Sequence, residues 1–535
     1  MAFYSVKQIY ETYETVIDQH ILVKGWVRTF RNQKNMTFLS VNDGTTIQNI
    51  QIVFSTSILS EEQTKNLGFG CSVIVKGTLI RSPSPAQPFE LSVSDGVDLE
   101  ICGSISGSNP VPAKGKVTLE FLRTIPHLRP RTNTFGAVAR MRHELAMATH
   151  DFYGKQNGFT LVAPPQITQN DCEGGGEAFQ VTTLLSDKNK LKKSIQNNQM
   201  MKKIDQDVSF VYDEKTTEML DVGLNNSILV VDEKNPINYS EDFFKAPAYL
   251  TVSGQLALET YCLALGGVYC YQSAFRADPS QTSRHVAEFT MLEVEIPFAD
   301  LSDNMNLAEA YIKYSISHVM SSCQSDMEFL DQFYYQKRLE TDKIAGHDTL
   351  ISYLTNLLET DFARMKYSEV MTVLLKVQAD GYKFDVPLPE TGIFDLKAEH
   401  ERYLTDVILK KPVFVTHYPK EIKAFYMKES ENIDQILEVP TVECCDLLVP
   451  GIGEVLGGSC RTSDLKKLTD SMTQHHLINL DGSSDLDYYI DLRRFGSVEH
   501  CGFGIGMSRL LMMITGMENI RDMIEFPRTI GSIKY

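Results

Sequence analysis

The first hundred residues alternate apolar and polar side chains in several short runs. ILVKGWVRTFR, MTFLSVNDG, IQNIQIVF and CSVIVKGTLI have the two-residue period of half-buried strands, and Asn42-Asp43-Gly44 is a turn signal. About five short strands with a glycine after the first are typical of a small barrel of the OB type. We therefore predict an N-terminal β-barrel over residues 1–106.

The pattern changes after the barrel. The run GSISGSNPVPAKGK is rich in Gly, Ser and Pro, so we place a hinge at residues 107–130. From Ala137 the apolar positions take helical spacing, and the helix leads into an apolar segment that ends at Pro165. We predict a second domain over residues 131–535, with a lysine-rich, solvated insertion around 186–243.

The clearest strand pattern of the second domain covers residues 269–295. Both ends alternate apolar and polar residues, and the middle, ADPSQTSR, has turn chemistry, so we predict an antiparallel hairpin with a long polar loop. Arg276 ends the first strand, Arg284 and His285 close the loop, and Phe289 lies on the second strand. A guanidinium grips phosphate and a ring stacks on a base, which favours a nucleotide site. The alternative is an ordinary surface hairpin whose arginine forms a salt bridge.

Near the C-terminus, HCGFGIGMSRLLMM predicts a glycine-punctuated strand that enters an apolar helix. Gly502 to Gly506 let a ligand approach the backbone closely, and Arg509, in the first helical turn, could reach a phosphate. This strand and helix are therefore a second candidate for phosphate binding.

Composition adds three constraints. Hydrophobic residues make up 43% of the 535 residues without a run of 18, so we expect a globular protein with no membrane span. The N-terminus lacks a signal or transit pattern, and the ten cysteines form no metal-like cluster, so we expect reduced thiols in the cytoplasm. The formal net charge of -18 means that any RNA contact must depend on local basic clusters.

Two stretches supply such clusters. On the first barrel hairpin, Arg28 and Phe38 are candidate RNA contacts, because OB barrels stack bases on aromatic rings and track phosphates with cations. Trp26 is expected to fill the barrel core. For the hinge, a solvated segment and an RNA contact both remain open for four basic residues, Arg123, His127, Arg129 and Arg131.

Three stretches, in chain order, resemble the signature motifs of class II aminoacyl-tRNA synthetases: Pro165, then Phe275-Arg276 with Arg284-His285 and Phe289, then Gly502 to Arg509. Eight long collinear segments, among them DCEGGGEAF, YLTVSGQLALE and DLLVPGIGEVLGGSCR, resemble the asparaginyl-tRNA synthetases. The resemblance implies an α+β fold in which an anticodon-reading OB barrel precedes a class II catalytic domain, an antiparallel sheet with flanking helices. It also implies a homodimer formed around Pro165.

The implied reaction joins L-asparagine to ATP, giving asparaginyl-adenylate, and then transfers the asparaginyl group to tRNA(Asn). Charge builds on the phosphoryl oxygens, so the site needs fixed cations and Mg²⁺. Arg276 would clamp the α-phosphate and Arg509 the γ-phosphate, while Phe289 would stack on adenine. The remaining residues implied for ATP are Arg284, His285, Glu454 and Gly506.

Asp446 and Glu454 flank a turn and offer the oxygen ligands that Mg²⁺ prefers, although a salt bridge is the alternative for Glu454. By resemblance, Glu177 would hold the α-ammonium group, with Ser253 and Gln255 facing the amino acid. Arg461 would donate to the side-chain carbonyl and Asp278 would accept from the amide, a donor–acceptor arrangement that can separate asparagine from aspartate.

Two positions depart from the family pattern. Asp278 stands where the family usually has Glu, and Ser508 stands where the third motif normally has an acid. Two alternatives remain open. An aspartyl-tRNA synthetase would share the barrel and motifs, but VSGQLALE lacks the lysine of the aspartyl loop. A catalytically dead tRNA-binding paralogue would be expected to lack Arg276, Arg509 or Glu454, and all three are present.

Overall fold

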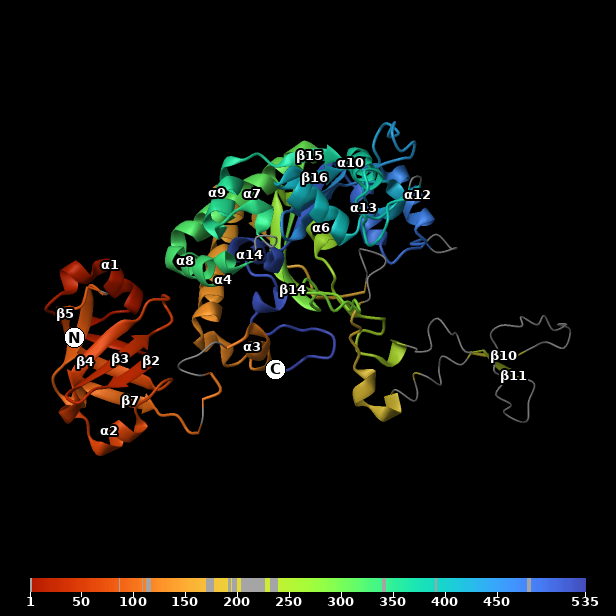
Figure 1. The fold of residues 1–535 in the computed structure, drawn as a ribbon. Coiled ribbons are helices and arrows are strands. Elements are labelled where there is room, and N and C mark those ends of the chain that lie inside the picture. Colours follow the sequence, from red (N-terminus) through yellow and green to blue (C-terminus); the bar gives the residue numbers. More distant parts are fainter. Residues whose placement is uncertain are drawn as a thin grey trace.

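The computed structural model describes residues 2–85, 87–107, 109–111, 117–169, 178–190, 194, 200–203, 227–230, 239–338, 343–389, 392–478 and 483–535. Most of the expected insertion at 186–243 therefore lies outside the described residues. Figure 1 shows the N-terminal barrel at one side of a larger body built on a sheet. Within the described part of the chain, no helix combines the length and apolar character needed to cross a membrane.

Five strands close into the N-terminal barrel: β2 (His20–Asn32), β3 (Met36–Asn42), β4 (Ile50–Ser55), β5 (Ser72–Arg81) and β6 (Phe89–Val93). All neighbouring pairs are antiparallel except β4 with β6, whose parallel pairing completes the ring. Alternate apolar residues fill the interior, and α1 (Val6–Val16) and β7 (Leu99–Gly103) flank the barrel. The predicted OB-type barrel is confirmed.

The prediction that Trp26 fills the barrel core is wrong. Its neighbours Val23 and Val27 point inward on β2, whereas Trp26 is 46% exposed. Arg28 donates hydrogen bonds to the backbone oxygen of Arg131 and, at 3.4 Å, to Asn42 Oδ1, so this candidate RNA contact is also tied to the hinge. Phe38 is half-buried on β3. The assignment of Arg28 and Phe38 to RNA binding stays a prediction.

The second domain is built on an eight-stranded sheet. Its order is β15 (Ala363–Lys366), β16 (Val413–Thr416), β17 (Cys444–Val449), β18 (Gly453–Cys460), β19 (His500–Gly506), β14 (Glu288–Pro297), β13 (Val268–Phe275) and β8 (Thr160–Leu161). Only the outermost pairs, β15 with β16 and β13 with β8, are parallel. The predicted hairpin is β13–β14, in which Ala274 lies opposite Phe289.

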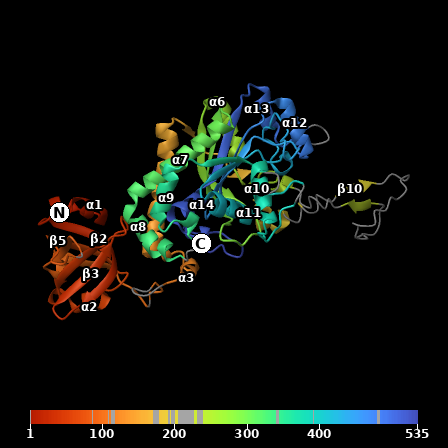
Figure 2. The same ribbon diagram turned by 45° about the horizontal axis from the view of Figure 1, so that its top comes forward.

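Helices cover this sheet in separate groups (Figure 2). One apolar core joins the central strands to α4 (Asn133–His150), α7 (Leu301–Ser322), α8 (Gln324–Phe333), α9 (Leu350–Glu359) and α14 (Met507–Thr515). A smaller core joins α6 (Gln255–Leu265) to α12 (Leu465–Gln474) and α13 (Asp487–Arg494), and α10 (Tyr367–Ala379) packs near β15 and β16. The helices therefore pack against the sheet and hold its strands in position.

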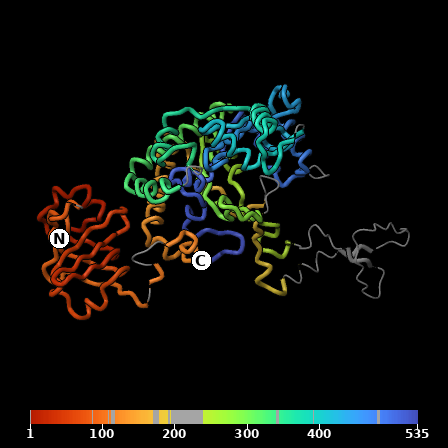
Figure 3. Tube along the Cα trace, viewed as in Figure 1, coloured from red at the N-terminus to blue at the C-terminus, as the bar shows by residue number. Residues whose placement is uncertain are grey.

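The hinge is anchored to the C-terminal segment of the chain. Figure 3 shows the blue C-terminal end beside the orange hinge, which contains α3 (Leu119–Thr124). Arg123 donates to both Asp522 oxygens at 2.9 and 2.5 Å. Arg129 is 1% exposed and donates to the backbone oxygens of Arg521 at 3.1 Å and Glu525 at 3.2 Å. The two interpretations that the sequence left open for Arg129, a solvated residue and an RNA contact, are both wrong, because its guanidinium is buried in the protein.

Replacing Asp522 by asparagine is expected to destabilise the hinge and its domain by about 3 kcal/mol, since Arg123 and Arg129 would lose a buried carboxylate. Urea unfolding followed by circular dichroism measures this effect. The matched control is Glu120→Gln, which removes an exposed partner 3.7 Å from Arg123 and should leave the stability nearly unchanged. Equal effects of the two variants would contradict the anchoring role of Asp522.

Candidate active site

A pocket of about 640 Å³ opens over β14, β18 and β19. Its walls come from segments hundreds of residues apart, which the antiparallel sheet brings to one face. Twelve residues singled out in the sequence line it: Ser253, Gln255, Arg276, Asp278, Arg284, His285, Phe289, Asp446, Glu454, Arg461, Gly506 and Arg509. Glu177 lies outside the described residues. Pro165 lines a separate depression with Pro164, Ile167 and Tyr261.

The hairpin register places an arginine over an aromatic ring. Arg276 follows the last rung of β13, where its backbone N–H donates to Ala287 at 3.0 Å, and its Cζ lies 5.6 Å from the centroid of Phe289. With the Arg276 guanidinium on one side of the Phe289 ring, a planar heterocycle can stack on the ring. The terminal nitrogens of Arg276 can then bind an anion. This geometry suits the base and α-phosphate of a nucleotide.

Positive charge gathers at the other end of the pocket. Arg284 Nη2 is buried without a hydrogen-bond partner among the described residues. Burial, together with the neighbouring Arg402 and Arg509, lowers the pKa of Arg284 to about 10. Arg509 Nη1 donates to the backbone oxygen of Glu454 at 2.8 Å. A buried guanidinium nitrogen that has no partner among the described residues, with other arginines beside it, favours binding of an anion, as a triphosphate tail would provide.

His285 contributes a neutral imidazole, and not a positive charge, to the pocket. Its Nδ1 lies 2.5 Å from Thr282 Oγ1 and 3.1 Å from Ser280 Oγ. Burial, and then the nearby Arg509, lower the pKa of His285, so the neutral form is favoured at neutral pH. His285 can therefore hydrogen-bond a phosphate from the loop without adding positive charge.

Two carboxylates face each other across the β17–β18 hairpin. A Cβ atom built on Gly457 would lie 3.5 Å from both Asp446 Oδ1 and Glu454 Oε1. Lys423 Nζ binds the other oxygen, Asp446 Oδ2, at 2.7 Å. Among the residues that the structure describes, no group of three or more His, Cys, Asp or Glu forms a closed metal site. The pair fits Mg²⁺, which accepts one or two carboxylates and completes its shell with phosphate oxygens. The alternative for Glu454, a salt bridge, has a long 3.7 Å contact to Arg509.

A third carboxylate, Glu401 on α11 (Ala398–Arg402), borders this end of the pocket. A Cβ built on Gly453 would lie 3.3 Å from Glu401 Oε2 and 2.7 Å from Arg284 Nη1. Burial, and then Glu454 and Asp446, raise the pKa of Glu401 to about 7, although the nearby Arg284 and Arg509 act to lower it. Folding therefore favours the protonated form of Glu401.

Because the pKa of Glu401 rises on folding, its stabilising effect is complete below about pH 4.5 and is lost as the pH rises through about 7. In metal-free buffer, the Glu401→Gln variant should melt a few degrees above the wild type at pH 8, and at the same temperature below about pH 4.5. Thermal melts followed by circular dichroism test this. The exposed Glu421→Gln substitution should show no such pH-dependent difference, and a similar gain there would contradict the assignment.

Three charged residues of the pocket escaped the sequence analysis: Lys423, Glu293 and Glu295. A signal for the two acids existed, because Phe289, Met291, Glu293 and Glu295 follow one another at intervals of two and all line the pocket. Had Phe289 been used to fix the inward face of β14, both acids would have been found. Lys423 lies in an irregular segment, where no periodicity marks the inward side.

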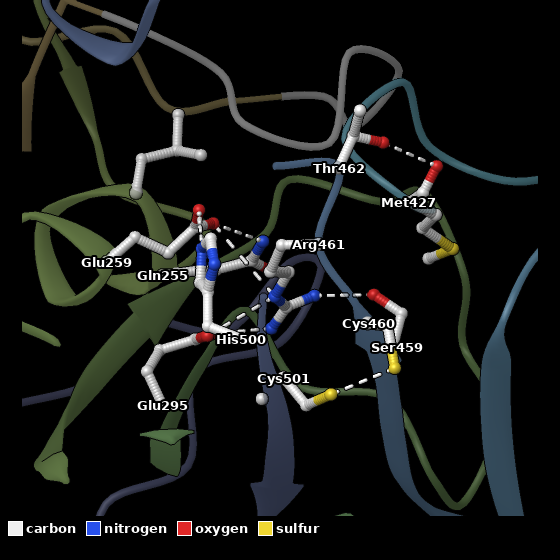
Figure 4. A network of polar contacts seen from close by, with 12 residues as sticks. Gln255, Glu259, Glu295, Met427, Ser459, Cys460, Arg461, Thr462, His500 and Cys501 are labelled. Carbon is white, nitrogen blue, oxygen red and sulfur yellow. Dashed lines mark hydrogen bonds and ion pairs between the residues drawn. The ribbon is translucent and has the colours of Figure 1, made fainter. Parts of the chain in front are cut away.

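The amino-acid end of the pocket is strongly acidic. Glu293 is 4% exposed and accepts from the backbone N–H of Gly254 at 2.9 and 3.1 Å and from the hydroxyl of Ser253. Arg461 donates to Glu295 through Nη2 at 2.5 Å and through Nε at 3.3 Å (Figure 4). The carboxylates that contact Arg461 are thus Glu295 and, at 4.0 Å, Glu259, whereas Asp278 lines the same pocket without a described contact to Arg461.

The comparisons with known proteins agree along the whole chain. A family model described as tRNA synthetases class II (D, K and N) matches residues 230–530, and an OB-fold nucleic acid binding domain matches residues 21–99. The chain is 40% identical to the asparagine–tRNA ligase of Clostridium tetani over 531 residues, 99% of each protein. It is 42% identical to that of Protochlamydia amoebophila, covering 97% of this chain and 96% of the relative.

Solved structures give the same picture. The asparaginyl-tRNA synthetase from Pyrococcus horikoshii complexed with asparaginyl-adenylate has a TM-score of 0.73 and 28% sequence identity, covering 98% of each chain. A putative aspartyl-tRNA synthetase from Leishmania major Friedlin has a TM-score of 0.70 at 17% identity, which shows a shared fold alone. The pocket thus lies in a fold common to both groups.

Proposed function

Since the chain belongs to the class II tRNA synthetases, we propose that it is an asparagine–tRNA ligase, which activates L-asparagine with ATP and transfers it to tRNA(Asn). The observation that carries the proposal is the convergence on one pocket of twelve residues expected for ATP, asparagine and the metal. The full-length identity to asparagine–tRNA ligases selects asparagine within the class.

In the activation step the α-carboxylate of asparagine attacks the α-phosphorus of ATP, and pyrophosphate leaves. The carboxylate is already an anion, so the step needs no general base, only fixed positive charge where the phosphoryl oxygens gain negative charge. Arg276 would bind the α-phosphate, with the base on Phe289. Arg284 and Arg509 would hold the departing pyrophosphate, in line with the unpaired Nη2 of Arg284. Asp446 and Glu454 would hold Mg²⁺, which neutralises phosphate charge when bound.

At the other end of the pocket, Glu293 is the described carboxylate suited to the α-ammonium group, the role given to Glu177 by resemblance. Arg461 would donate to the side-chain carbonyl oxygen. Asp278 and Glu295 both line the pocket and are candidate acceptors for the side-chain amide. After activation, a ribose hydroxyl at the 3′ end of the tRNA would attack the asparaginyl carbonyl, and AMP would leave.

We also propose that the barrel binds tRNA through the face that carries Trp26, Arg28 and Phe38, and that the protein is a cytoplasmic homodimer. In support of a dimer, the outer strand β8 exposes Leu161, and Ile167 and Tyr261 are exposed beside Pro165. The free thiols among the described cysteines suit a reducing compartment. Sedimentation equilibrium would test the dimer directly.

The experiment that tests the reaction is ATP–pyrophosphate exchange by the purified protein with Mg²⁺, comparing L-asparagine with L-aspartate. Exchange with asparagine, followed by charging of tRNA(Asn), is the expected result. Exchange with aspartate alone would assign the chain to the aspartyl group. Exchange with neither would support a catalytically dead tRNA-binding protein.

A further inference from the structure

Glu259 of α6 is a buried carboxylate behind the pocket that the reaction does not use. Its side chain is fully buried, and it accepts hydrogen bonds from Gln255 Nε2 at 3.1 Å and His500 Nε2 at 3.0 Å (Figure 4). It also accepts from Tyr489 at 2.8 and 2.9 Å and from Arg493 Nη2 at 2.9 Å. One carboxylate therefore joins α6, α13 and β19 beneath the amino-acid end of the pocket.

The surroundings keep Glu259 ionised. Burial alone would raise its pKa, but Arg493, His500 and Arg461 outweigh burial and hold the pKa of Glu259 well below its usual range. A buried charge is stable only when paired and hydrogen-bonded, and both conditions are met here. Glu259 is thus an ionised carboxylate in the wall of the site, paired directly with Arg493 at 2.9 Å.

This charge reaches the pocket through Arg461. Arg461 Nε lies 4.0 Å from Glu259 Oε1, and the guanidinium also pairs with Glu295 and donates from Nη1 to Ser459 Oγ at 2.7 Å. These bonds use three of the five N–H groups of Arg461 and leave one on each terminal nitrogen. The remaining N–H groups can bind the oxygen of a carboxamide or of a carboxylate. Their hydrogen bonds alone therefore cannot separate asparagine from aspartate.

Charge adds a discrimination between the two side chains that these hydrogen bonds of Arg461 do not provide. Two carboxylates share the positive charge of Arg461, so an incoming aspartate would gain little net attraction from it and would meet the repulsion of the ionised Glu259. Burial raises the pKa of Glu295 to about 7, so its own repulsion is weaker at neutral pH. A neutral carboxamide of the same shape loses nothing by this arrangement. We propose that Glu259 is a specificity-determining positioning residue, whose buried negative charge behind Arg461 makes the pocket favour asparagine over aspartate. This inference rests on the proposed function.

The test is Glu259→Gln, which keeps the shape of the side chain and removes its charge. We expect the ratio of kcat/KM for aspartate to that for asparagine in pyrophosphate exchange to rise about tenfold or more. We also expect the inhibition constant of L-aspartate against asparagine-dependent exchange to fall. The matched control is Tyr489→Phe, which removes a hydrogen bond to Glu259 but no charge and should leave both quantities unchanged.

The two levels of the proposal can fail separately. If the wild type shows no exchange with asparagine, the proposed function is wrong. If the wild type is active and the folded Glu259→Gln variant keeps the wild-type ratio, or if Tyr489→Phe changes the ratio equally, the inference about Glu259 is overturned. If the Glu259→Gln variant does not fold, Arg493→Met provides a second test. It removes the cation paired with Glu259 instead of the negative charge, so the inhibition constant of L-aspartate should rise. A decrease there would also overturn the inference.

Discussion

The Arg276→Ala variant is expected to lose asparagine-dependent pyrophosphate exchange, with kcat at least about 10³-fold below the wild type. Removing one fixed donor from a developing oxyanion typically costs 10²–10³-fold, and this guanidinium also stacks on Phe289, where the base would lie. Single-turnover formation of the adenylate, measured at saturating ATP and asparagine, separates loss of chemistry from loss of binding.

A second variant at this position shows whether bidentate binding by the guanidinium matters or only its charge, and a surface arginine provides the control. Arg276→Lys keeps a positive charge but cannot bind phosphate bidentately, so it should recover only a small part of the activity. Arg494→Ala removes an arginine that is paired with Asp491 on the surface and should behave as the wild type. If Arg276→Ala kept more than about a tenth of the wild-type kcat, the role given to this residue would be wrong.

Gly502→Ala should be nearly as damaging, although Gly502 is not itself a candidate ligand. A Cβ atom at this position would lie 2.1–2.4 Å from the carboxylate of Glu295, which pairs with Arg461. Because Glu295 must move, the Arg461 fork should turn away, and kcat/KM for asparagine should fall at least about 10²-fold.

The matched control is Gly504→Ala, two residues along the same strand. There the added methyl group would meet the end of the flexible Met291 side chain at 2.9 Å, which can move at little cost. Pyrophosphate exchange over a range of asparagine concentrations, with circular dichroism to confirm folding, compares the two variants. Equal losses would mean that β19 tolerates no side chain at either position, and that Glu295 has no special part.

Local sequence patterns predicted the positions of strands more reliably than they predicted which side chains are buried. The alternation around residues 269–295 predicted β13 and β14 with Arg276 and Phe289 near the tip, because strand period and turn chemistry are properties of neighbouring residues. Trp26 was expected in the barrel core, whereas the period of β2 turns it outward. The sequence could have resolved that position, had strand period been given more weight than hydrophobicity.

Other features depend on contacts that no local pattern contains. Arg129 looked like a solvated or RNA-binding residue, and only its carbonyl partners near residue 521, 392 positions away, explain its burial. Glu259 was not singled out in the sequence, because its partners Arg493 and His500 lie 234 and 241 positions downstream. Charged residues that are buried by distant partners are invisible to periodicity, because their environment is formed only when the sheet closes.

The anchoring of the hinge has a consequence for how the chain is made. Arg123 precedes its partner Asp522 by 399 residues, so at about 5–20 residues per second the ribosome needs about 20–80 s to deliver that partner. The barrel closes without any residue beyond position 103 and can fold while synthesis continues. The nascent chain therefore carries a folded barrel on a hinge that is not yet anchored, and the Arg123–Asp522 contact forms only after residue 522 emerges.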